Sequence, residues 1–325
     1  MNSRFLLACS LLASISCSGG SSETTAGDKR FLSIGTAPPG GAFFVVGGAL
    51  GEVLGEFGPA GWEVTSEATK GSQENIRRLA SGELDVALSN AAITYFAARG
   101  EDDWERAHDV QTVMTLAPNV AMLLAPRDSG VESIPDIRNK RVVVGPAGAG
   151  WESFVSRIFA AHGVSFDEFT PLNNTQSGSV DMLADGSAAA AFIGGAVPTA
   201  SIIQATTSQN ILLVPFDDAA IESLSAEYPF FDVRVVPGGT YRGQDEDFRG
   251  LDVGSMHLIA SAGADEELIY QITKTIYENR AAVTARHPAG NFINPENVTR
   301  DTGVPFHPGA VRYYREIGIW PEGEG

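Results

Sequence analysis

Two glycine-rich segments have the residue types and the spacing of an anion-binding site. Residues 34–44 read IGTAPPGGAFF, and residues 144–154 read VGPAGAGWESF. Each segment passes from a short apolar stretch through glycines into a helix-like stretch, which leaves backbone N–H groups at the start of a helix open to a ligand. Such N–H groups and the helix dipole stabilise an anion without a lysine in the loop. The two loops therefore predict a site for a small anion.

The common catalytic and nucleotide-binding motifs are absent from the sequence. It contains no Gly-Lys-Ser/Thr of a Walker A loop, no HExxH and no GxSxG, and the glycines at 145, 148 and 150 are not spaced as GxGxxG. His287 and His307 each precede a proline, which favours a loop or a helix cap over a general base. We therefore predict no catalytic residue, no metal and no cofactor, and we favour a binding protein over an enzyme.

Strand-like and helix-like stretches alternate along the chain, a pattern typical of an α/β fold with largely parallel sheets. Strands are expected at 31–34, 62–66, 85–88, 110–116, 120–125, 141–144, 169–172, 188–193 and 211–214. Helices are expected at 41–57, 72–80, 152–161, 179–184 and 198–206. Each glycine loop would then lie at the carboxyl end of a strand, where open α/β sheets bind their ligands.

The order of strand, glycine loop and helix occurs twice, which suggests an internal repeat. Residues 75–88 (NIRRLASGELDVAL) also resemble residues 179–192 (SVDMLADGSAAAAF), and these two segments lie nearly as far apart as the two glycine loops do. Similar spacings for two separate matches predict two lobes of similar topology. Lobes that face each other would place both glycine loops on one cleft.

Composition and charge argue against nucleic acid as a partner, and the cysteine positions argue against a disulfide framework. The chain has 325 residues, 43% of them hydrophobic and 19% charged, and a formal net charge of −18. No basic stripe could neutralise the phosphates of a nucleic acid. The two cysteines, Cys9 and Cys17, both lie near the N-terminus, so the rest of the chain can form no disulfide framework.

The N-terminal residues have the features of a secretory signal. One basic residue precedes an apolar run that is too short to span a bilayer. We predict a signal peptide at 1–16, lipidation at Cys17 and a Gly/Ser-rich tether at 17–30. Plain cleavage of the signal and acylation at Cys9 are the alternatives. The protein is thus expected in the periplasm or at the extracytoplasmic face of the membrane.

Four strings along the chain resemble one family. They are GTAPPGGAFF, TKGSQENIRRLASGELDVAL, PGGTYRGQDEDF (237–248) and VPFHPGAVRYYREIG (304–318). On these strings the chain resembles a TAXI-type solute-binding protein of a tripartite ATP-independent periplasmic (TRAP) transporter. The resemblance implies a two-lobed periplasmic binding protein-like α/β fold (type II). It also implies capture of a small organic acid, such as glutamate or 2-oxoglutarate, and delivery to membrane-embedded permease subunits driven by a sodium gradient.

The expected ligand site follows from the loops and from the family positions. The chain lacks several hydroxyls that the family carries, because Ala42, Ala149 and Trp151 stand at those positions, and Lys70 adds a cation. The ligand is therefore expected to be a carboxylate with a more apolar body, with Trp151 as a wall; a buried structural tryptophan and a solvated surface lysine are the alternatives. The complete predicted set is Gly40, Gly41, Ala42, Phe43, Phe44, Lys70, Ser72, Asn90, Gly148, Ala149, Gly150, Trp151, Gln176, Gly195 and Pro198.

Other functions remain open at this point. An ABC-type binding protein, a binding module that serves a sensor, and an exported enzyme acting on small acids could all share this fold. In each case we expect one lobe at 31–125 together with 251–325, and a second lobe at 126–250. The C-terminal stretch 306–320 would pack on the first lobe or on the hinge.

Overall fold

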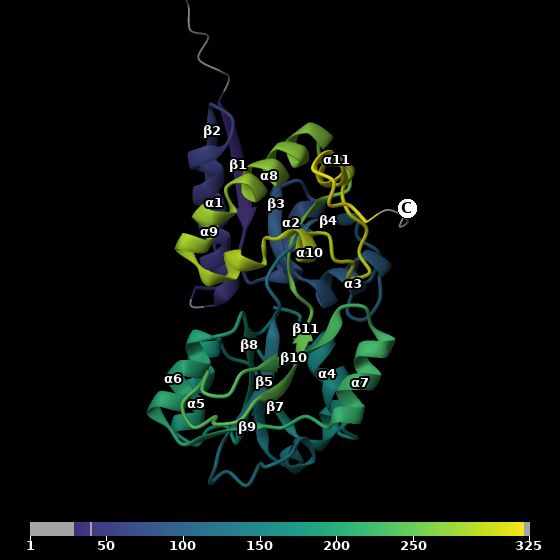
Figure 1. Cartoon of the computed structure of the whole chain (residues 1–325). Helices are drawn as coiled ribbons and strands as arrows, with labels where there is room; N and C mark the ends of the chain where they lie inside the picture. Colours follow the sequence, from purple (N-terminus) through teal and green to yellow (C-terminus); the bar gives the residue numbers. More distant parts are fainter. Residues whose placement is uncertain (1–28, 40, 322–325) are drawn as a thin grey trace, which may run out of the picture.

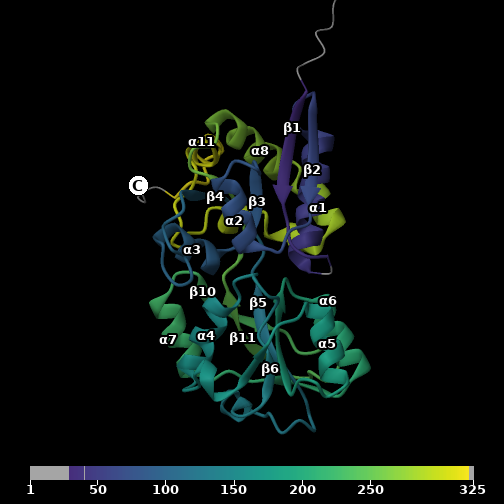
Figure 2. The same cartoon turned by 180° about the vertical axis from the view of Figure 1, so that it is seen from behind.

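The computed structural model describes residues 29–39 and 41–321 of the chain. These residues form two α/β lobes, one above the other in Figures 1 and 2, and the chain passes between them twice. The first passage lies between strands β4 (Val110–Thr115) and β5 (Val120–Pro126), and the second between β11 (Phe248–Val253) and β12 (Met256–Ser261). The second lobe is thus inserted between two parts of the first.

A five-stranded mixed sheet forms the first lobe, with the strand order β2-β1-β3-β12-β4. Strand β1 (Arg30–Gly35) runs parallel to β2 (Trp62–Glu67) and to β3 (Val86–Asn90), whereas β12 runs antiparallel to β3 and β4. Every residue of β3 is buried, as expected for a central strand with helices on both faces of its sheet.

A seven-stranded mixed sheet forms the second lobe, in the order β10-β11-β5-β8-β6-β7 with β9 paired to β5. Strand β6 is parallel to β7 and β8, and β5 is antiparallel to β8, β9 and β11. The strands not yet placed are β6 (Arg141–Val143), β7 (Thr170–Leu172), β8 (Ala190–Gly195), β9 (Ile211–Val214) and β10 (Phe231–Val236).

The internal repeat is visible in the strand pairing. The order β2-β1-β3-β12 in the first sheet and the order β7-β6-β8-β5 in the second have the same sequence of parallel, parallel and antiparallel neighbours. The glycine loops that follow β1 and β6 therefore occupy equivalent places in the two lobes.

Helices cover both sheets. Those of the first lobe are α1 (Ala42–Phe57), α2 (Ser72–Ala80), α3 (Ala91–Arg99), α8 (Glu266–Glu278), α9 (Arg280–Arg286), α10 (Pro295–Val298) and α11 (Pro308–Glu316). Those of the second lobe are α4 (Glu152–Ala161), α5 (Gln176–Ala184), α6 (Ala200–Ser208) and α7 (Asp218–Glu227). Short 3-10 turns lie at Ile134–Ile137, Phe166–Glu168 and Pro288–Phe292. Within the described part of the chain, no helix is long and apolar enough to cross a membrane.

The C-terminal helix α11 belongs to the first lobe. It packs on α8 and on β4, with Tyr313 and Tyr314 both buried. The hydroxyl of Tyr314 donates to the carbonyl of Val113 in β4, with an O···O distance of 2.9 Å. The last helix that the structure describes thus packs in the core of the same lobe as β1.

Three expectations about this architecture were wrong. The sheets are mixed rather than largely parallel, because β5 and β12 enter their sheets from the passages between the lobes and run against their neighbours. The expected boundary at 125/126 would leave β5 in the first lobe, but β5 pairs with strands of the second sheet. The expected boundary at 250/251 would cut β11, which continues to Val253 before the chain returns.

A buried aromatic cluster joins the lobes beside α3, α4 and α7. The ring of Phe96 on α3 lies 5.5 Å from that of Phe230, which precedes β10 in the second lobe. The guanidinium of Arg157 on α4 lies 4.0 Å from the Phe96 ring centroid and 3.5 Å from a carboxylate oxygen of Asp102. The two lobes therefore touch through buried aromatic side chains as well as through the two passages.

Candidate functional site

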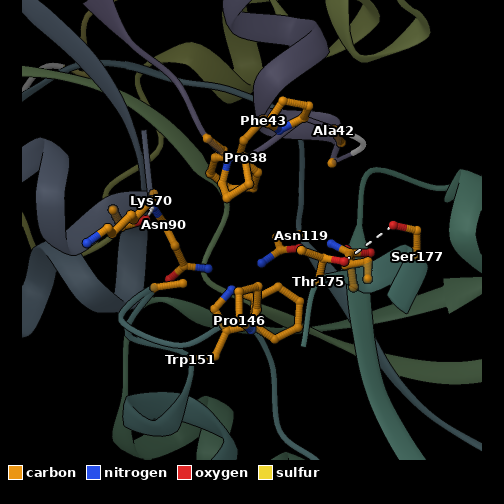
Figure 3. A pocket seen from close by; sticks show the side chains of 18 residues that line it. Pro38, Ala42, Phe43, Lys70, Asn90, Asn119, Pro146, Trp151, Thr175 and Ser177 are labelled. Carbon is orange, nitrogen blue, oxygen red and sulfur yellow. Dashed lines mark hydrogen bonds between the residues drawn. The ribbon is translucent and has the colours of Figure 1, made fainter. Parts of the chain in front are cut away.

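A pocket with a volume of about 70 Å³ lies between the two lobes. The first lobe contributes the loop before α1, the start of α2 and the end of β3, and the second contributes the loop before α4, the start of α5 and the end of β8. Figure 3 shows the 18 side chains around it. They are Ala37, Pro38, Pro39, Gly41, Ala42, Phe43, Lys70, Gly71, Ser72, Asn90, Asn119, Pro146, Ala149, Trp151, Thr175, Gln176, Ser177 and Gly194.

Two helices of the first lobe begin at this pocket without a side-chain cap. Gly41 precedes α1 and Gly71 precedes α2, and neither can offer a side-chain oxygen to the first N–H groups of its helix. Helices α7 and α8, which begin elsewhere, are capped by Asp217 and Asp265. The open N–H groups and the positive ends of the helix dipoles make this wall of the pocket attractive to an anion.

The pocket has one charged side chain in its lining. Lys70 is exposed, and the structure gives its ammonium group no ion pair with any described residue. No aspartate or glutamate lines the pocket. Figure 3 shows the Lys70 ammonium turned away from the space between Pro38, Asn119 and Trp151, so Lys70 adds positive charge beside the pocket rather than inside it. A ligand ammonium would find no oppositely charged side chain in the lining.

Asn90 lines the pocket but uses its side chain to build it. The amide oxygen accepts from the backbone N–H groups of Ala92 and Ile93, at 2.9 and 3.3 Å, and so caps α3. The amide nitrogen donates to the carbonyls of Val253 and Gly254, at 3.2 and 2.8 Å. Asn90 therefore holds the second passage against α3, and its amide has no hydrogen left to donate to a ligand.

The side chain of Asn119, unlike that of Asn90, is not used in hydrogen bonds to other described residues. It lies in the first passage between the lobes, and only 3% of its surface is exposed. The structure shows no hydrogen bond from its amide to any described residue, and its buried Oδ1 atom has no partner. Figure 3 shows the amide nitrogen turned toward the space between Asn90 and Trp151.

Trp151 forms part of one wall of the pocket. A Cβ built at Gly145, where φ is +118°, would lie 2.7 Å from the Trp151 ring, so the indole rests directly on the backbone of its own loop. The ring also packs 5.6 Å from that of Phe154 in the buried core. The two alternatives considered from the sequence, a pocket wall and a structural tryptophan, are thus combined in one half-buried side chain.

The lobes meet on both sides of the pocket. A Cβ built at Gly71 would lie 3.7 Å from the Cβ of Ala149, and one built at Gly195 would lie 3.7 Å from the Cβ of Ala42. Each of these pairs joins one residue of the first lobe to one of the second. The structure therefore has the lobes closed around the pocket.

A buried carboxylate ties together the two passages behind the pocket. Asp252 accepts from the backbone N–H of Asn119 at 2.9 Å and from the hydroxyl of Ser255 at 2.6 Å, and Arg300 lies 3.4 Å away. Burial raises the pKa of Asp252, while Arg300 and these hydrogen bonds act in the opposite direction. The carboxylate thus fixes the backbone at the point where both passages run side by side.

Comparison with known proteins adds a family to this geometry. Residues 34–318 match the profile of the NMT1-like family, which is most of the chain. The chain belongs to the NMT1-like family.

Solved structures share the two-lobed fold of this NMT1-like protein. The alkanesulfonate-binding protein SsuA from Xanthomonas axonopodis pv. citri, bound to MOPS, matches with a TM-score of 0.52 and 17% identity, over 91% of this chain and 86% of its own. A binding protein component of an ABC phosphonate transporter from Pseudomonas aeruginosa matches with a TM-score of 0.55 and 12% identity, over 81% and 79%. PhnD1 from Prochlorococcus marinus, in complex with methylphosphonate, matches with a TM-score of 0.55 and 9% identity, over 89% and 99%.

These findings confirm the fold and correct the predicted family. The two-lobed periplasmic binding protein-like fold is confirmed. The prediction of a TAXI-type protein of a TRAP transporter was wrong. The family match is to the NMT1-like family, and the neighbours are named for sulfonate or phosphonate, one of them as part of an ABC transporter. The predicted TRAP permease subunits are therefore withdrawn as partners.

The pocket of this NMT1-like protein is lined by nine of the residues predicted from the sequence. Those that line it are Gly41, Ala42, Phe43, Lys70, Ser72, Asn90, Ala149, Trp151 and Gln176. Five others do not line it: Phe44, Gly148, Gly150, Gly195 and Pro198. Gly150 packs instead against the first lobe, and Gly194 lines the pocket in place of its neighbour Gly195. Gly40 and Cys17 lie outside the described residues.

Several lining residues were missed by the sequence analysis. Ala37, Pro38, Pro39, Gly71 and Pro146 lie inside the quoted glycine-loop and TKGS strings, so the signal was present but was assigned to their neighbours. Thr175 and Ser177 flank the predicted Gln176 at the start of α5. Asn119 stands in a short Pro-Asn segment between two strands, and it had no motif to mark it.

Proposed function

We propose that this protein is an extracytoplasmic solute-binding protein that captures a small organic anion and delivers it to a membrane permease of the ABC type. The observation that carries the proposal is the pocket between the lobes, which is lined by uncapped helix N-termini and by Lys70 and by no acidic side chain. The family and the names of its structural neighbours support binding rather than catalysis.

The size and lining of the pocket favour a short monoanion. A volume of about 70 Å³ is space for roughly five waters at about 10–15 Å³ each. One lysine and several neutral donors suit a carboxylate or a sulfonate, whose single charge they can balance. Pro38, Phe43 and Trp151 provide apolar surface for the body of the ligand, at about 25 cal/mol for each Å² that is buried.

A panel of matched anions tests this proposal. Carboxylates, sulfonates and phosphonates with the same alkyl body, together with glutamate, should be compared by thermal shift and then by calorimetry. A ligand that binds only the folded state raises the melting temperature. We expect a short alkyl carboxylate or sulfonate to bind more tightly than glutamate. Tighter binding of glutamate than of every apolar anion would contradict the proposed ligand class, and binding of no anion would contradict the function.

The proposed location rests on the signal-like N-terminus and on Cys17. Metabolic labelling with a fatty-acid analogue should mark the wild-type protein and leave Cys17→Ser unlabelled. A Cys9→Ser variant serves as the control, because it retains the proposed acylation site. Labelling that persists in Cys17→Ser would exclude this anchor.

A further inference from the structure

Asn119 is a polar side chain in the pocket that no other described residue satisfies. Only 3% of the residue is exposed, and its buried Oδ1 atom has no hydrogen-bond partner. Its Nδ2 atom, which Figure 3 shows turned toward the pocket, makes no hydrogen bond to any described residue. Asn90, across the pocket, uses both atoms of its amide within the protein. Buried polar groups in folded proteins are nearly always paired, so an unpaired amide that faces a ligand pocket indicates a partner on the ligand.

The backbone of Asn119 is held firmly. Its N–H donates to a carboxylate oxygen of Asp252 at 2.9 Å, and its carbonyl accepts from the N–H of Val253 at 3.0 Å. Ser255 and Arg300 hold the same carboxylate. Asp252 is thus a positioning residue, since it fixes the backbone from which the Asn119 amide reaches the pocket.

The chemistry of an amide differs from that of the anion-binding groups around it. The ammonium of Lys70 and the open N–H groups of α1 and α2 only donate hydrogen bonds. The hydroxyl of Ser72 accepts from the N–H of Asn90 at 3.0 Å, which leaves its own proton to donate. Asn119 adds a buried acceptor, next to a donor on the same group. A simple alkyl carboxylate or sulfonate cannot donate to this acceptor.

We propose that Asn119 selects organic anions that carry a hydroxyl beside the charged head group. In the orientation that Figure 3 shows, the amide nitrogen donates to the ligand hydroxyl; when the amide rotates so that its oxygen faces the pocket, the hydroxyl donates to that oxygen. Rotation of the amide that exchanges its two atoms leaves this pairing intact, because a hydroxyl both donates and accepts. The inference rests on the proposed function of the pocket as a site for a small organic anion.

Two pairs of anions test the inference by calorimetry. They are 2-hydroxybutanoate against butanoate, and 2-hydroxyethanesulfonate against ethanesulfonate. A site built to bond a hydroxyl rejects the analogue that lacks it, so wild-type protein should bind the hydroxylated member of the better-bound pair at least about tenfold more tightly. Asn119→Leu, which has a similar volume and no hydrogen-bonding group, should reduce that ratio to within about twofold.

Asn210→Leu is the matched control, because Asn210 is exposed on the second lobe and lies outside the pocket. The control should retain the wild-type ratio. Equal binding of the two members by wild-type protein would overturn the inference without the need for a variant. A preference that survives unchanged in folded Asn119→Leu, or in Asn119→Ala, would also overturn it. If neither member of either pair binds but another anion of the panel does, the inference is overturned and the proposed function stands. If no anion of the panel binds, both are contradicted.

Discussion

Gly150 of the second lobe packs against Gln73 of the first. A Cβ built at Gly150 would lie 3.0 Å from the Cγ of Gln73 and 3.1 Å from the Cδ1 of Ile93, and φ at this glycine is +84°. We expect Gly150→Ala to weaken ligand binding at least about tenfold, because the added methyl group opposes closure of the lobes. Calorimetry and small-angle scattering with and without ligand measure the effect. Gly148→Ala is the control, since Gly148 has a similar φ of +71° with nothing within 4 Å of its built Cβ. Equal losses in both variants would assign the effect to backbone strain alone.

Gly41→Asp should weaken anion binding at least about tenfold without lowering the melting temperature. The position has room, because a built Cβ comes no closer than 3.8 Å to the carbonyl oxygen of Pro38. An aspartate before a helix accepts from its first N–H groups and typically stabilises it. The new carboxylate would therefore occupy the donors of α1 and repel an anionic ligand. Gly55→Asp adds the same charge to an exposed site of α1 with open space and should bind normally. Unchanged affinity in Gly41→Asp would remove this loop from the site.

Lys70→Gln should lower the affinity for a monoanion by up to about fivefold and reduce the dependence of binding on salt. Lys70 is the single charged side chain in the lining of the described pocket, and salt screens an exposed charge of this kind. Lys70→Arg keeps the charge and should preserve most of the salt dependence. Titrations at several ionic strengths make the comparison. A salt dependence that is the same in Lys70→Gln and in wild-type protein would show that the lysine is only a solvated surface residue.

Trp151→Ala should cost more affinity for butanoate than for acetate. The longer anion buries more apolar surface against the indole, at about 25 cal/mol for each Å². The variant also loses the packing of the ring on Gly145 and Phe154, so its melting temperature should fall. The ratio of the two affinities separates these effects, because lost stability does not depend on the length of the anion. A ratio equal to that of wild-type protein would assign Trp151 to the core alone.

The free energy of unfolding should fall in mild acid because His257 takes up a proton only in the unfolded chain. Burial, together with the charge of Arg300, lowers the pKa of His257 to about 3, from an ordinary value of 6.5. As pH falls through 6.5, the unfolded chain takes up a proton that the folded chain excludes, so stability is lost as pH decreases toward 3 and is almost unaffected above about 7.5. This group alone should remove about 2 kcal/mol between pH 8 and pH 5. Urea unfolding at both pH values should show a smaller loss in His257→Gln. An equal loss in that variant would place the titrating group elsewhere.

Local signals were strong enough to predict most of the elements that carry the pocket. The helices at 72–80 and 152–161 were predicted with the bounds that the structure has. In each case a glycine lies one or two residues before the helix, and apolar residues then recur at helical spacing. The repeat of strand, glycine loop and helix correctly indicated two lobes that face one cleft. Helix α3 and strands β10 to β12 were not predicted. Helix α3 reads AAITYFAAR and is too uniformly apolar to show a helical face.

The features of the fold and of the site that could not be predicted depend on contacts between distant parts of the chain. Strand β5 belongs to the second sheet because it pairs with β8, β9 and β11. All three strands lie much later in the sequence. The amide nitrogen of Asn90 donates both of its hydrogens to the carbonyls of Val253 and Gly254, which no local pattern could indicate. Asn119 lines the pocket only because the first passage between the lobes, in which it lies, runs along the pocket. Conversely, the strings compared with the TAXI family pointed to the right fold and to the wrong family.

The position of β12 also determines when each lobe can be completed during synthesis. This strand lies between β3 and β4, yet the whole second lobe is made after β4 and before β12. The second sheet needs no residue beyond β11, so it can form while the first still lacks an inner strand. Until residues 256–261 emerge, β3 and β4 each have an unpaired edge, and such edges invite pairing with other chains. A chain interrupted just before Met256 would therefore hold a finished lobe joined to one with two unpaired strand edges, which β12 covers when it pairs with β3 and β4.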